Sequence, residues 1–338
     1  MHLSRRFAMA GTLFVAGLLT VPPGSAQAST AAAWPGDPAV AVADAAGAFG
    51  DNLSGLSFQG ADVLWAVKNG PGTLYRLVRR DGLWRPADGW SSGKRLHYAD
   101  GGGDPDAEAV VATPDGVVAA TERDNDGDGS LLKVLRFDGS ATGSSLDAVA
   151  EWDLTDDLPA VDDNGGFEAI SWIPDTFLTA GGFLDEHTKK PYDPAAYPDH
   201  GTGLYFVGLE DEGKVYAYAL NRSGGGFTRV AAFSAGFPNV MELEFEPETG
   251  SLWSVCDNTC DGRSARLKLV DGRFKVAATY ARPAKMPNYN NEGFAIAPQS
   301  SCASGRKEVV WADDGNDGDH ALRRGTLPCQ PPSASATA

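Results

Sequence analysis

The segment N-L-S-G-L-S-F at residues 52–58, followed after a short turn by L-W-A-V-K-N at residues 64–69, decides the fold because the chain repeats it. Apolar residues alternate with small or polar ones in both segments, which indicates two antiparallel strands. Four later pairs match this pattern: 107–111 with 117–124, 166–172 with 176–179, 239–245 with 252–258, and 291–296 with 309–314. Five copies of one strand pair therefore organise the chain.

The spacing of the copies indicates the architecture. Their equivalent positions, residues 54, 108, 168, 241 and 292, are separated by 54, 60, 73 and 51 residues. Further strands follow within most copies, at 73–78, 131–137, 215–220 and 266–270. Four strands per unit at this spacing, with no helical period between them, are typical of β-propeller blades. We predict an all-β protein with a single β-propeller. Five blades are favoured, six are left open, and a β-sandwich is the alternative.

Two places depart from the regular pattern. The fifth copy has no evident fourth strand, so we expect residues 39–49 to supply it and to close the ring with an N-terminal strand. The third copy is long, and its proline-containing stretch 185–203 is expected to be a loop over one face. The segments Tyr192–His200 and 288–290 (N-Y-N), together with Trp65, are candidate exposed contacts for a ligand, although aromatic residues at such places more often serve packing.

The composition and the N-terminal segment indicate which partners the protein has and where it is located. The 338 residues include 45 acidic and 28 basic ones, and the formal net charge of −17 disfavours nucleic acid as a partner. Arg5 and Arg6 precede an apolar stretch, and A-Q-A at residues 26–28 offers a cleavage site, so residues 1–28 are predicted to be a signal peptide. We expect a secreted, monomeric propeller domain over residues 29–329, without a membrane span, and a disordered tail at residues 330–338.

Four cysteines fit two disulfides in an exported chain. In a blade, strands one and three end at the same edge, so Cys302 and Cys329, which follow those strands in the fifth copy, should meet. Cys256 and Cys260 lie in one loop between strands, where a local bridge can form. We therefore predict the pairs Cys256–Cys260 and Cys302–Cys329. The alternative, a zinc site that begins at Cys256, lacks a histidine at ligand spacing.

Acidic residues recur at one edge of the predicted blades. They stand where inner strands begin or second strands end, so they should surround one mouth of the central channel. Like charges gathered in this way need compensation, and a calcium ion with oxygen ligands supplies it outside the cytoplasm. The candidate metal ligands are Glu108, Glu122, Asp124, Asp126, Asp128, Glu168, Glu242, Asp257, Glu292, Asp313 and Asp314.

Three further features qualify the calcium prediction. The loop 124–129 (D-N-D-G-D-G) matches the opening of an EF-hand calcium loop, but the twelfth position is Leu135 instead of glutamate. Aspartate, asparagine and glycine also form turns without any metal, and that alternative stays open. Finally, Lys68, Arg123 and Arg263 could neutralise part of the ring or bind an anionic ligand.

The five openings, in their order, resemble the SdiA-regulated propeller family of YjiK-type exported proteins. The motifs are N-L-S-G-L-S-F, D-A-E-A-V, G-G-F-E-A-I, N-V-M-E-L-E-F and N-E-G-F-A-I, and the resemblance covers roughly residues 50–325. The chain is also similar to the neighbouring family described as esterase-like activity of phytase. The resemblance implies a calcium-associated propeller. The chain departs from the family pattern where alanine follows Glu108 and Glu168, where Met241-Glu242 shifts the acid by one position, and in the third copy, whose second strand shows no acidic end.

Two functions follow from these observations. None of the histidines stands in a recognisable triad context, which disfavours a serine hydrolase. A calcium-dependent esterase or phosphoesterase could use Glu108, Glu168 or Glu292 as catalytic base on a small ester or phosphoester. In the alternative, calcium is structural and the propeller binds a glycan, a peptide or another ligand at the cell envelope.

Overall fold

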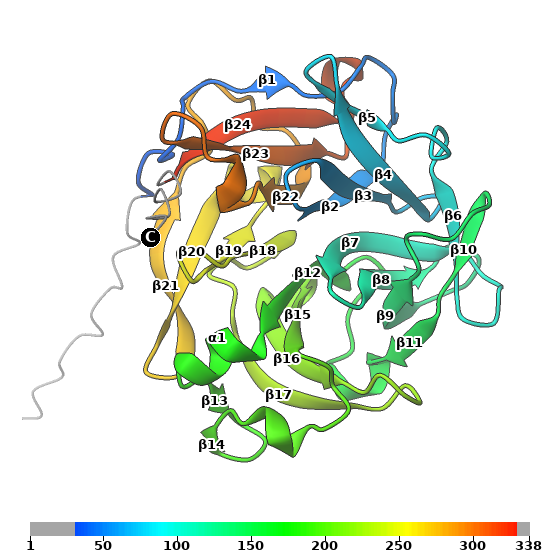
Figure 1. Ribbon diagram of the computed structural model, residues 1–338, viewed down its shortest axis with the longest axis vertical. Coiled ribbons are helices and arrows are strands. Elements are labelled where there is room, and N and C mark those ends of the chain that lie inside the picture. The colour runs from blue at the N-terminus through cyan, green and yellow to red at the C-terminus, as the bar shows by residue number, and fades with distance from the viewer. Residues whose placement is uncertain (1–30, 330–338) are drawn as a thin grey trace, which may run out of the picture. The chain divides into compact units, whose positions relative to one another are not determined.

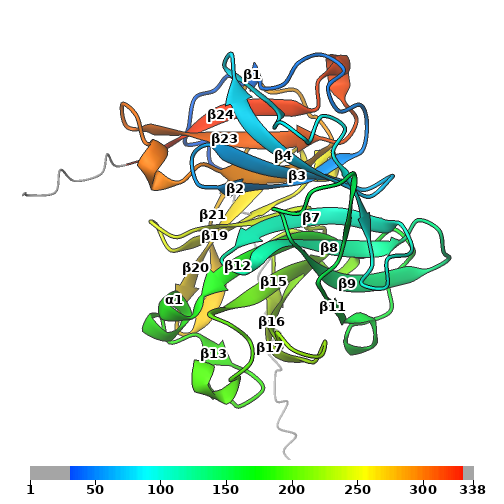
Figure 2. The same ribbon diagram turned by 45° about the vertical axis from the view of Figure 1, so that its right-hand side comes forward.

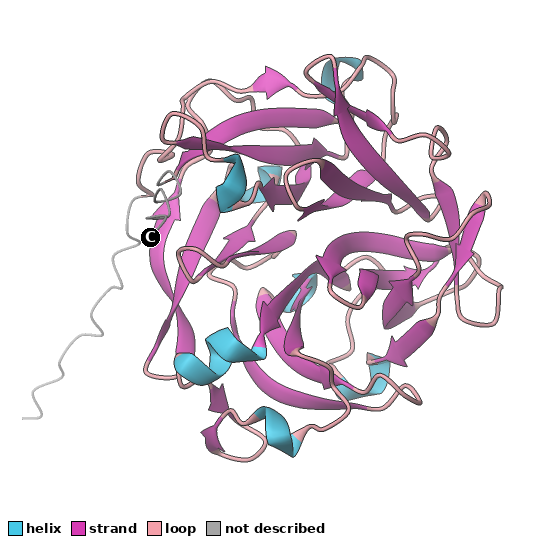
Figure 3. Ribbon diagram, viewed as in Figure 1, coloured by secondary structure: helices cyan, strands magenta, loops and turns pink. Residues whose placement is uncertain are grey.

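The computed structural model describes residues 31–329, which form five antiparallel blades around a central channel (Figure 1). Strands make up nearly all of the regular structure (Figure 3). The predicted signal peptide 1–28 and tail 330–338 lie outside the described residues. The five-bladed β-propeller expected from the repeats is confirmed, and the six-bladed and sandwich alternatives are wrong.

The first blade is the largest, and the second contains four strands in a simple order. Figure 2 shows the two blades next to each other in a view turned by 45°. A short strand from the connection after the second blade, β10, pairs in parallel with β6 and so joins the first blade. The first blade contains β2 (Leu53–Gln59), β3 (Val63–Lys68), β4 (Thr73–Arg80), β5 (Leu83–Pro86), β6 (Lys94–His97) and β10 (Ser145–Asp147); the second contains β7 (Pro105–Thr113), β8 (Gly116–Asp124), β9 (Ser130–Phe137) and β11 (Ala150–Asp153).

The other three blades have four strands each. In the fifth blade the outermost strand comes from the N-terminal side of the chain, because β1 pairs with β24 through Ala41 and Arg324. This confirms the predicted closure of the ring. The strands are β12 (Phe167–Pro174), β15 (Gly203–Leu209), β16 (Lys214–Leu220) and β17 (Phe227–Ser234); β18 (Glu242–Glu246), β19 (Ser251–Val255), β20 (Ser264–Val270) and β21 (Arg273–Tyr280); and β22 (Asn291–Ile296), β23 (Arg306–Asp313), β24 (Leu322–Pro328) and β1 (Ala41–Val42).

The hydrophobic core lies between the blades. Five clusters of buried side chains each join one blade to the next, and the fourth and fifth blades, for example, share Trp253 and Trp311. The innermost strands β2, β7, β12, β18 and β22 contact one another in that order around the channel (Figure 1). Burial of apolar faces between blades is the main stabilising term of such a ring, and it holds the inner strands at fixed positions around the channel.

The third blade differs from the prediction. Residues 176–179 were expected to form its second strand, but they belong to helix α1 (Asp175–Ala180). The helix begins after Pro174 and is followed by Gly181, and Asp175 in its first turn is favourable for the helix dipole. The second strand is β15, which begins only after an insertion that also contains the hairpin of β13 (Leu184–Asp185) and β14 (Lys190–Pro191).

The insertion is packed and is not an open loop. Tyr192, Tyr197 and His200 are buried. The Tyr192 hydroxyl donates to Asp175 Oδ1 at 2.8 Å, and the Tyr197 hydroxyl donates to Asp185 Oδ2 at 2.7 Å. The packing alternative therefore holds for these aromatic residues, and their role as exposed ligand contacts is wrong. The same is true of Trp65, which lies in the core between the first two blades.

Both predicted disulfides, Cys256–Cys260 and Cys302–Cys329, are present. They use all four cysteines, which excludes the alternative of a zinc site built on Cys256. The Cys302–Cys329 bridge joins the ends of strands β22 and β24, as blade geometry requires. Within the described part of the chain, none of the helices has the length and apolar character needed to span a membrane.

Candidate functional site

Four inner strands begin with a β-bulge, and in three of them the bulge contains a glutamate. The register between β7 and β8 shifts between Ala107 and Ala109, which leaves Glu108 out of the ladder. The same shift leaves out Glu168 between β12 and β15 and Glu292 between β22 and β23. A bulged residue escapes strand pairing and can re-aim its side chain. We call Glu108, Glu168 and Glu292 the bulge glutamates.

The bulge glutamates come together although they belong to three different blades. One carboxylate oxygen of each lies within 4.8 Å of the other two. Two more groups adjoin this one at the same distance limit: Asp106 with Glu108 and Glu122, and Glu122 with Glu168 and Glu210. Six carboxylates from the second, third and fifth blades thus form one continuous cluster at the channel mouth.

Burial and mutual repulsion raise the pKa values of the cluster. Burial first, and then the neighbouring Glu292 and Asp106, raise the pKa of Glu108 well above its ordinary value. For Glu168 the pKa is raised by burial and then by Glu108 and Glu292. Burial also raises the pKa of Glu122 to about 7, against a hydrogen bond from the Gly166 N–H. The cluster therefore disfavours its own ionisation unless a cation is present.

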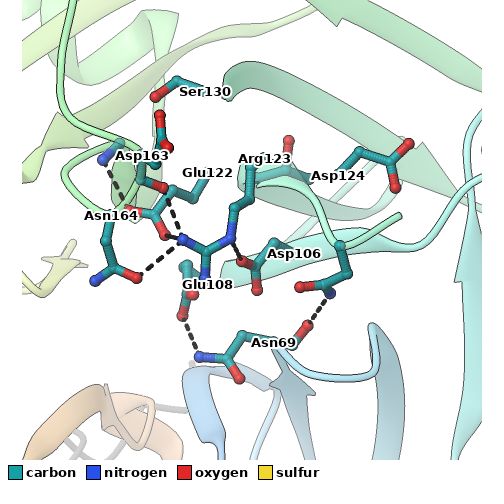
Figure 4. A network of polar contacts seen from close by, with 12 residues as sticks. Asn69, Asp106, Glu108, Glu122, Arg123, Asp124, Ser130, Asp163 and Asn164 are labelled. Carbon is teal, nitrogen blue, oxygen red and sulfur yellow. Dashed lines mark hydrogen bonds and ion pairs between the residues drawn. The ribbon is translucent and has the colours of Figure 1, made fainter. Parts of the chain in front are cut away.

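One arginine is the main positive charge at this site (Figure 4). Arg123 Nε lies 2.7 Å from Asp106 Oδ2, and its Nη1 donates to the Asp163 carbonyl at 2.7 Å and to Asn164 Oδ1 at 3.0 Å. Burial raises the pKa of Asp106 to about 6, although the arginine acts in the opposite direction. A single guanidinium cannot balance six ionised carboxylates, so the remaining charge must be relieved by protonation or by a further cation.

The other two basic candidates do not reach the cluster. Lys68 Nζ donates to the Phe49 carbonyl at 2.9 Å, and Arg263 Nε donates to the Cys260 carbonyl at 2.6 Å. Neither side chain lines the cavity at the channel mouth. Of the three predicted ligand-binding cations, the structure thus brings only Arg123 to the site.

A polar cavity of about 350 Å³ opens above the bulge glutamates. We call it the acidic cavity. Its walls carry carboxylates and amides and almost no apolar side chains. The lining consists of Asn52, Asn69, Gly70, Asp106, Glu108, Arg123, Asn125, Asn164, Glu168, Asn290, Glu292 and Asp314. A cavity with this lining is suited to a hydrated cation or a small polar molecule and is unsuited to an apolar ligand.

The hydrogen bonds of the cluster show whether it suits a cation. Glu108 Oε2 accepts from Asn69 Nδ2 at 3.1 Å, and Glu292 Oε1 accepts from Asn290 Nδ2 at 2.9 Å. Buried oxygens of the cavity lining, however, have no hydrogen-bond partner within residues 31–329, namely Asn69 Oδ1, Glu292 Oε2 and Asp314 Oδ1. Buried oxygens without donors are uncommon in proteins. Their presence together fits oxygen ligation of a metal ion.

Several predicted metal ligands do not join the cluster. Glu242 has no bulge: it pairs with Val255, and its carboxylate accepts from the N–H groups of Leu243 at 2.9 Å and of Leu56 at 3.2 Å. The Leu56 bond crosses the channel between blades that are not neighbours. Asp257 accepts from Thr259 N at 2.9 Å and caps a 3₁₀ turn over Asn258–Cys260. These two acids therefore have structural hydrogen bonds that the sequence did not indicate.

The aspartates of the 124–129 loop form a turn. Asp124 Oδ1 accepts from the N–H groups of Asp104 at 2.9 Å and of Asp126 at 3.1 Å, while Asp126 and Asp128 are exposed. None of the three belongs to a group of acids close enough to hold a metal among the described residues. Asp313 accepts from Asp317 N at 2.9 Å and lies outside the cavity lining, whereas Asp314 is part of it.

Two acids of the cluster were missed in the sequence. Glu210 begins a 3₁₀ turn, Glu210–Glu212, directly after β15, so it is the acidic end of the third blade's second strand. The sequence pattern pointed to residues 176–179 as that strand, and the prediction that the third copy lacks an acidic end is wrong. Asp106 precedes Glu108 by two residues, and the repeat pattern gave no signal for it because the other copies have no acid there.

Comparisons with known proteins reveal no family. No protein-family model matches the chain, and no curated protein matches it. Solved structures share the propeller architecture at low identity. The PQQ-bound aldose sugar dehydrogenase of Streptomyces coelicolor is 14% identical, with a TM-score of 0.41 over 86% of this chain and 98% of that one. The WD40 domain of Toxoplasma gondii coronin is 11% identical, with a TM-score of 0.38 over 89% and 90%. A Bacteroides caccae protein of unknown function is 10% identical, with a TM-score of 0.39 over 78% of each chain. The similarity concerns the fold alone.

Proposed function

We propose that this protein is an exported calcium-binding β-propeller whose metal site is held by the bulge glutamates. The observation that carries the proposal is the convergence of Glu108, Glu168 and Glu292 within 4.8 Å, from three separate blades. Three buried like charges at this distance are unfavourable on their own, and a divalent cation turns that repulsion into attraction. The resemblance to the SdiA-regulated and phytase-like families is part of this proposal.

Calcium fits the ligand set better than zinc or copper. The ligands at hand are carboxylate and amide oxygens, and Asn69 Oδ1 is a neutral oxygen without a donor from the described chain. Calcium takes six to eight such oxygens with flexible geometry, whereas zinc prefers histidine and cysteine. The two disulfides agree with maturation in an oxidising compartment, where calcium is plentiful.

We further propose that the site hydrolyses a small ester or phosphoester bound in the acidic cavity. When bound, calcium would polarise the ester or phosphoryl oxygen and favour deprotonation of a water molecule. Glu292 is the best placed of the bulge glutamates to accept that proton, since it is half-buried and its Oε2 has no hydrogen-bond partner among residues 31–329. Arg123, in the cavity wall, would bind the negative end of the substrate.

A purely structural calcium is the second candidate function, and one observation favours it. The cluster already connects blades, since Glu108 bonds to Asn69 of the first blade and the Ser54 hydroxyl donates to the Glu108 carbonyl at 2.6 Å. An ion among the bulge glutamates would add the third and fifth blades to these contacts. The propeller would then bind an envelope ligand, such as a glycan or peptide, without catalysis.

The deciding experiment combines thermal melting with hydrolysis assays. The purified protein is melted with a chelator and then with added calcium, and aryl phosphate and aryl acetate are tested as substrates under both conditions. We expect a large upward shift of Tm with calcium and hydrolysis that needs calcium. A shift without hydrolysis would support the structural role. The absence of any shift would contradict both functions and leave the acids as turn-forming and pairing residues.

A further inference from the structure

The opposite end of the channel holds a second cavity with different chemistry. Its volume is about 240 Å³, and it lies where the inner strands end. Aromatic and aliphatic side chains form most of its wall, among them Phe58, Ala112, Trp172, Phe245 and Ile296. We call it the apolar pocket. It differs from the acidic cavity in that it can bury the hydrocarbon part of a ligand.

The two cavities share no lining residue, and the buried Glu242 of the inner strand β18 belongs to neither. Its side chain is 1% exposed, and it accepts hydrogen bonds from Leu243 and, across the channel, from Leu56. It lines neither cavity. A molecule in the apolar pocket would therefore bind independently of a cation held by the bulge glutamates, and the two ends of the channel can be tested one at a time.

The inserted segment of the third blade builds one side of the apolar pocket. Pro174, which lines the pocket, is the residue from which helix α1 starts. Phe177 of that helix packs edge-on against Phe245 of the pocket wall, with ring centroids 4.8 Å apart. The insertion thus lies at the apolar end of the channel, away from the bulge glutamates, and it supports one of the walls a ligand would touch.

The lining of the apolar pocket contains three acidic side chains, Glu244, Glu246 and Glu248, and one basic side chain, Lys307. Lys307 is buried, and its Nζ lies 2.8 Å from Glu246 Oε1 and 3.6 Å from Glu248 Oε2. Glu246 is further bonded by the indole N–H of Trp253 at 3.1 Å. The lysine is thus committed to these two acids. Glu244 remains, and within the described chain only the Ile296 N–H donates a hydrogen bond to it, at 3.2 Å. A carboxylate between aromatic side chains, without a cation of its own, is a ready partner for a positive ligand.

We propose that the apolar pocket binds a small organic cation, namely a protonated amine on an aromatic or aliphatic body. The ammonium group would pair with the Glu244 carboxylate, and the apolar body would lie against Phe58, Trp172 and Phe245. The volume suits a molecule of on the order of ten non-hydrogen atoms. A neutral alcohol of the same shape would lose the ion pair, and an anion would find no cation free to pair with it, because Lys307 is bound to Glu246 and Glu248.

Binding should depend on pH through Glu244. Burial raises the pKa of this carboxyl to about 8, with the Ile296 N–H and Lys307 acting against the shift and Glu246 and Glu248 adding to it. The free pocket therefore holds a proton on Glu244 at neutral pH, and that proton leaves when an ammonium enters. The affinity for an amine should rise as the pH increases toward about 8, level off there and fall again once the pH exceeds the pKa of the amine itself.

The test is a calorimetric titration of the purified protein with phenethylamine, phenethyl alcohol and phenylacetate, with calcium present throughout to occupy the other end of the channel. We expect the amine to bind at least about tenfold more tightly than the alcohol, which corresponds to about 1.4 kcal/mol, and phenylacetate to bind more weakly than either. Failure of the amine to bind, or equal affinity for amine and alcohol, would overturn the proposal.

Three variants locate the binding site. Glu244→Gln keeps an oxygen for the Ile296 N–H and removes the charge, so amine affinity should fall about tenfold while alcohol affinity stays the same. Ala112→Phe fills the pocket and should remove binding of both; it keeps the proposal testable if the first variant folds poorly. Glu292→Gln, in the acidic cavity, should leave amine binding unchanged. If Glu292→Gln weakens amine binding and Glu244→Gln does not, the amine binds in the acidic cavity and the proposal is refuted.

Discussion

The bulge glutamates and the aspartates of the 124–129 loop carry the same chemical group and lie on the same side of the propeller. The loop is the more familiar calcium motif in the sequence, yet its aspartates bond to backbone N–H groups or face solvent. The bulge glutamates are some 60 and 124 residues apart in the chain, and three blades bring them within 4.8 Å. In this protein the contiguous acids form a turn, whereas three acids that are far apart in the chain converge.

The first prediction, with the largest effect, concerns pH and stability without calcium. Glu122 has its pKa raised to about 7, so its contribution to stability is complete at low pH and is lost as the pH rises through about 7. This residue alone should lower the free energy of unfolding by about 3 kcal/mol between pH 5 and pH 8, and Glu108 and Glu168 act in the same direction. Urea unfolding in a chelator at several pH values measures it.

Added calcium should remove most of this pH dependence, because an ion stabilises the ionised form of the cluster. The loop aspartates should contribute nothing to the slope. The variant carrying Asp126→Asn and Asp128→Asn should therefore show the same fall as the wild type. A calcium-free protein whose stability rises from pH 5 to pH 8 would show that burial and repulsion do not dominate the ionisation of the cluster.

The second prediction removes one charge from the bulge glutamates. Glu168→Gln should abolish most of the calcium-dependent gain in stability, which for the wild type is about 2.7 kcal/mol at a hundredfold excess over the dissociation constant. Without calcium at pH 8 the same variant should be more stable than the wild type, because a buried like charge is gone. Melting curves with chelator and with calcium give both values. A variant that is destabilised equally in the two conditions would show that Glu168 acts in packing alone.

The repeat explains how much of the fold was predictable. Alternating apolar residues at a regular spacing fix the blades, and the closing strand and both disulfides follow from blade geometry. The third blade was misread because T-F-L-T at residues 176–179 is too short for its periodicity to tell a strand from a helix. That error concealed β15, and with it Glu210.

The site was less predictable because it depends on bulges. If Glu108, Glu168 and Glu292 were paired regularly in their strands, their side chains would point in other directions. No residue in these segments indicates that the register shifts at the glutamate. Glu242 shows where a prediction from sequence spacing fails. It stands next to the equivalent position in the fourth copy, but β18 pairs without a bulge, and its carboxylate bonds across the channel. Sequence spacing alone cannot separate these two roles.

The third prediction concerns the cation within the cluster. Arg123→Gln removes the partner of Asp106 and the bonds to the Asp163–Asn164 segment. Without calcium the variant should lose about 2 kcal/mol of stability, as expected for charge-assisted hydrogen bonds. Calcium should bind several-fold more tightly, because a nearby positive charge is gone. Calorimetric titration with calcium tests the second effect. If calcium binds more weakly to the variant, Arg123 stabilises the metal site and does not compete with the ion.

The last and smallest effect tests the loop aspartates against the bulge glutamates directly. The Asp126→Asn, Asp128→Asn double variant should change the free energy of unfolding by less than about 0.5 kcal/mol, as exposed substitutions do. Asp124 separates turn formation from metal binding more sharply. Asp124→Asn keeps an oxygen for the N–H groups of Asp104 and Asp126 and should be nearly neutral, whereas Asp124→Ala leaves both without that acceptor and should lose about 1 kcal/mol. The loss should be the same in chelator and in calcium, because the carboxylate holds the turn. A loss that appears only with calcium, and that Asp124→Asn shares, would assign the loop a metal after all.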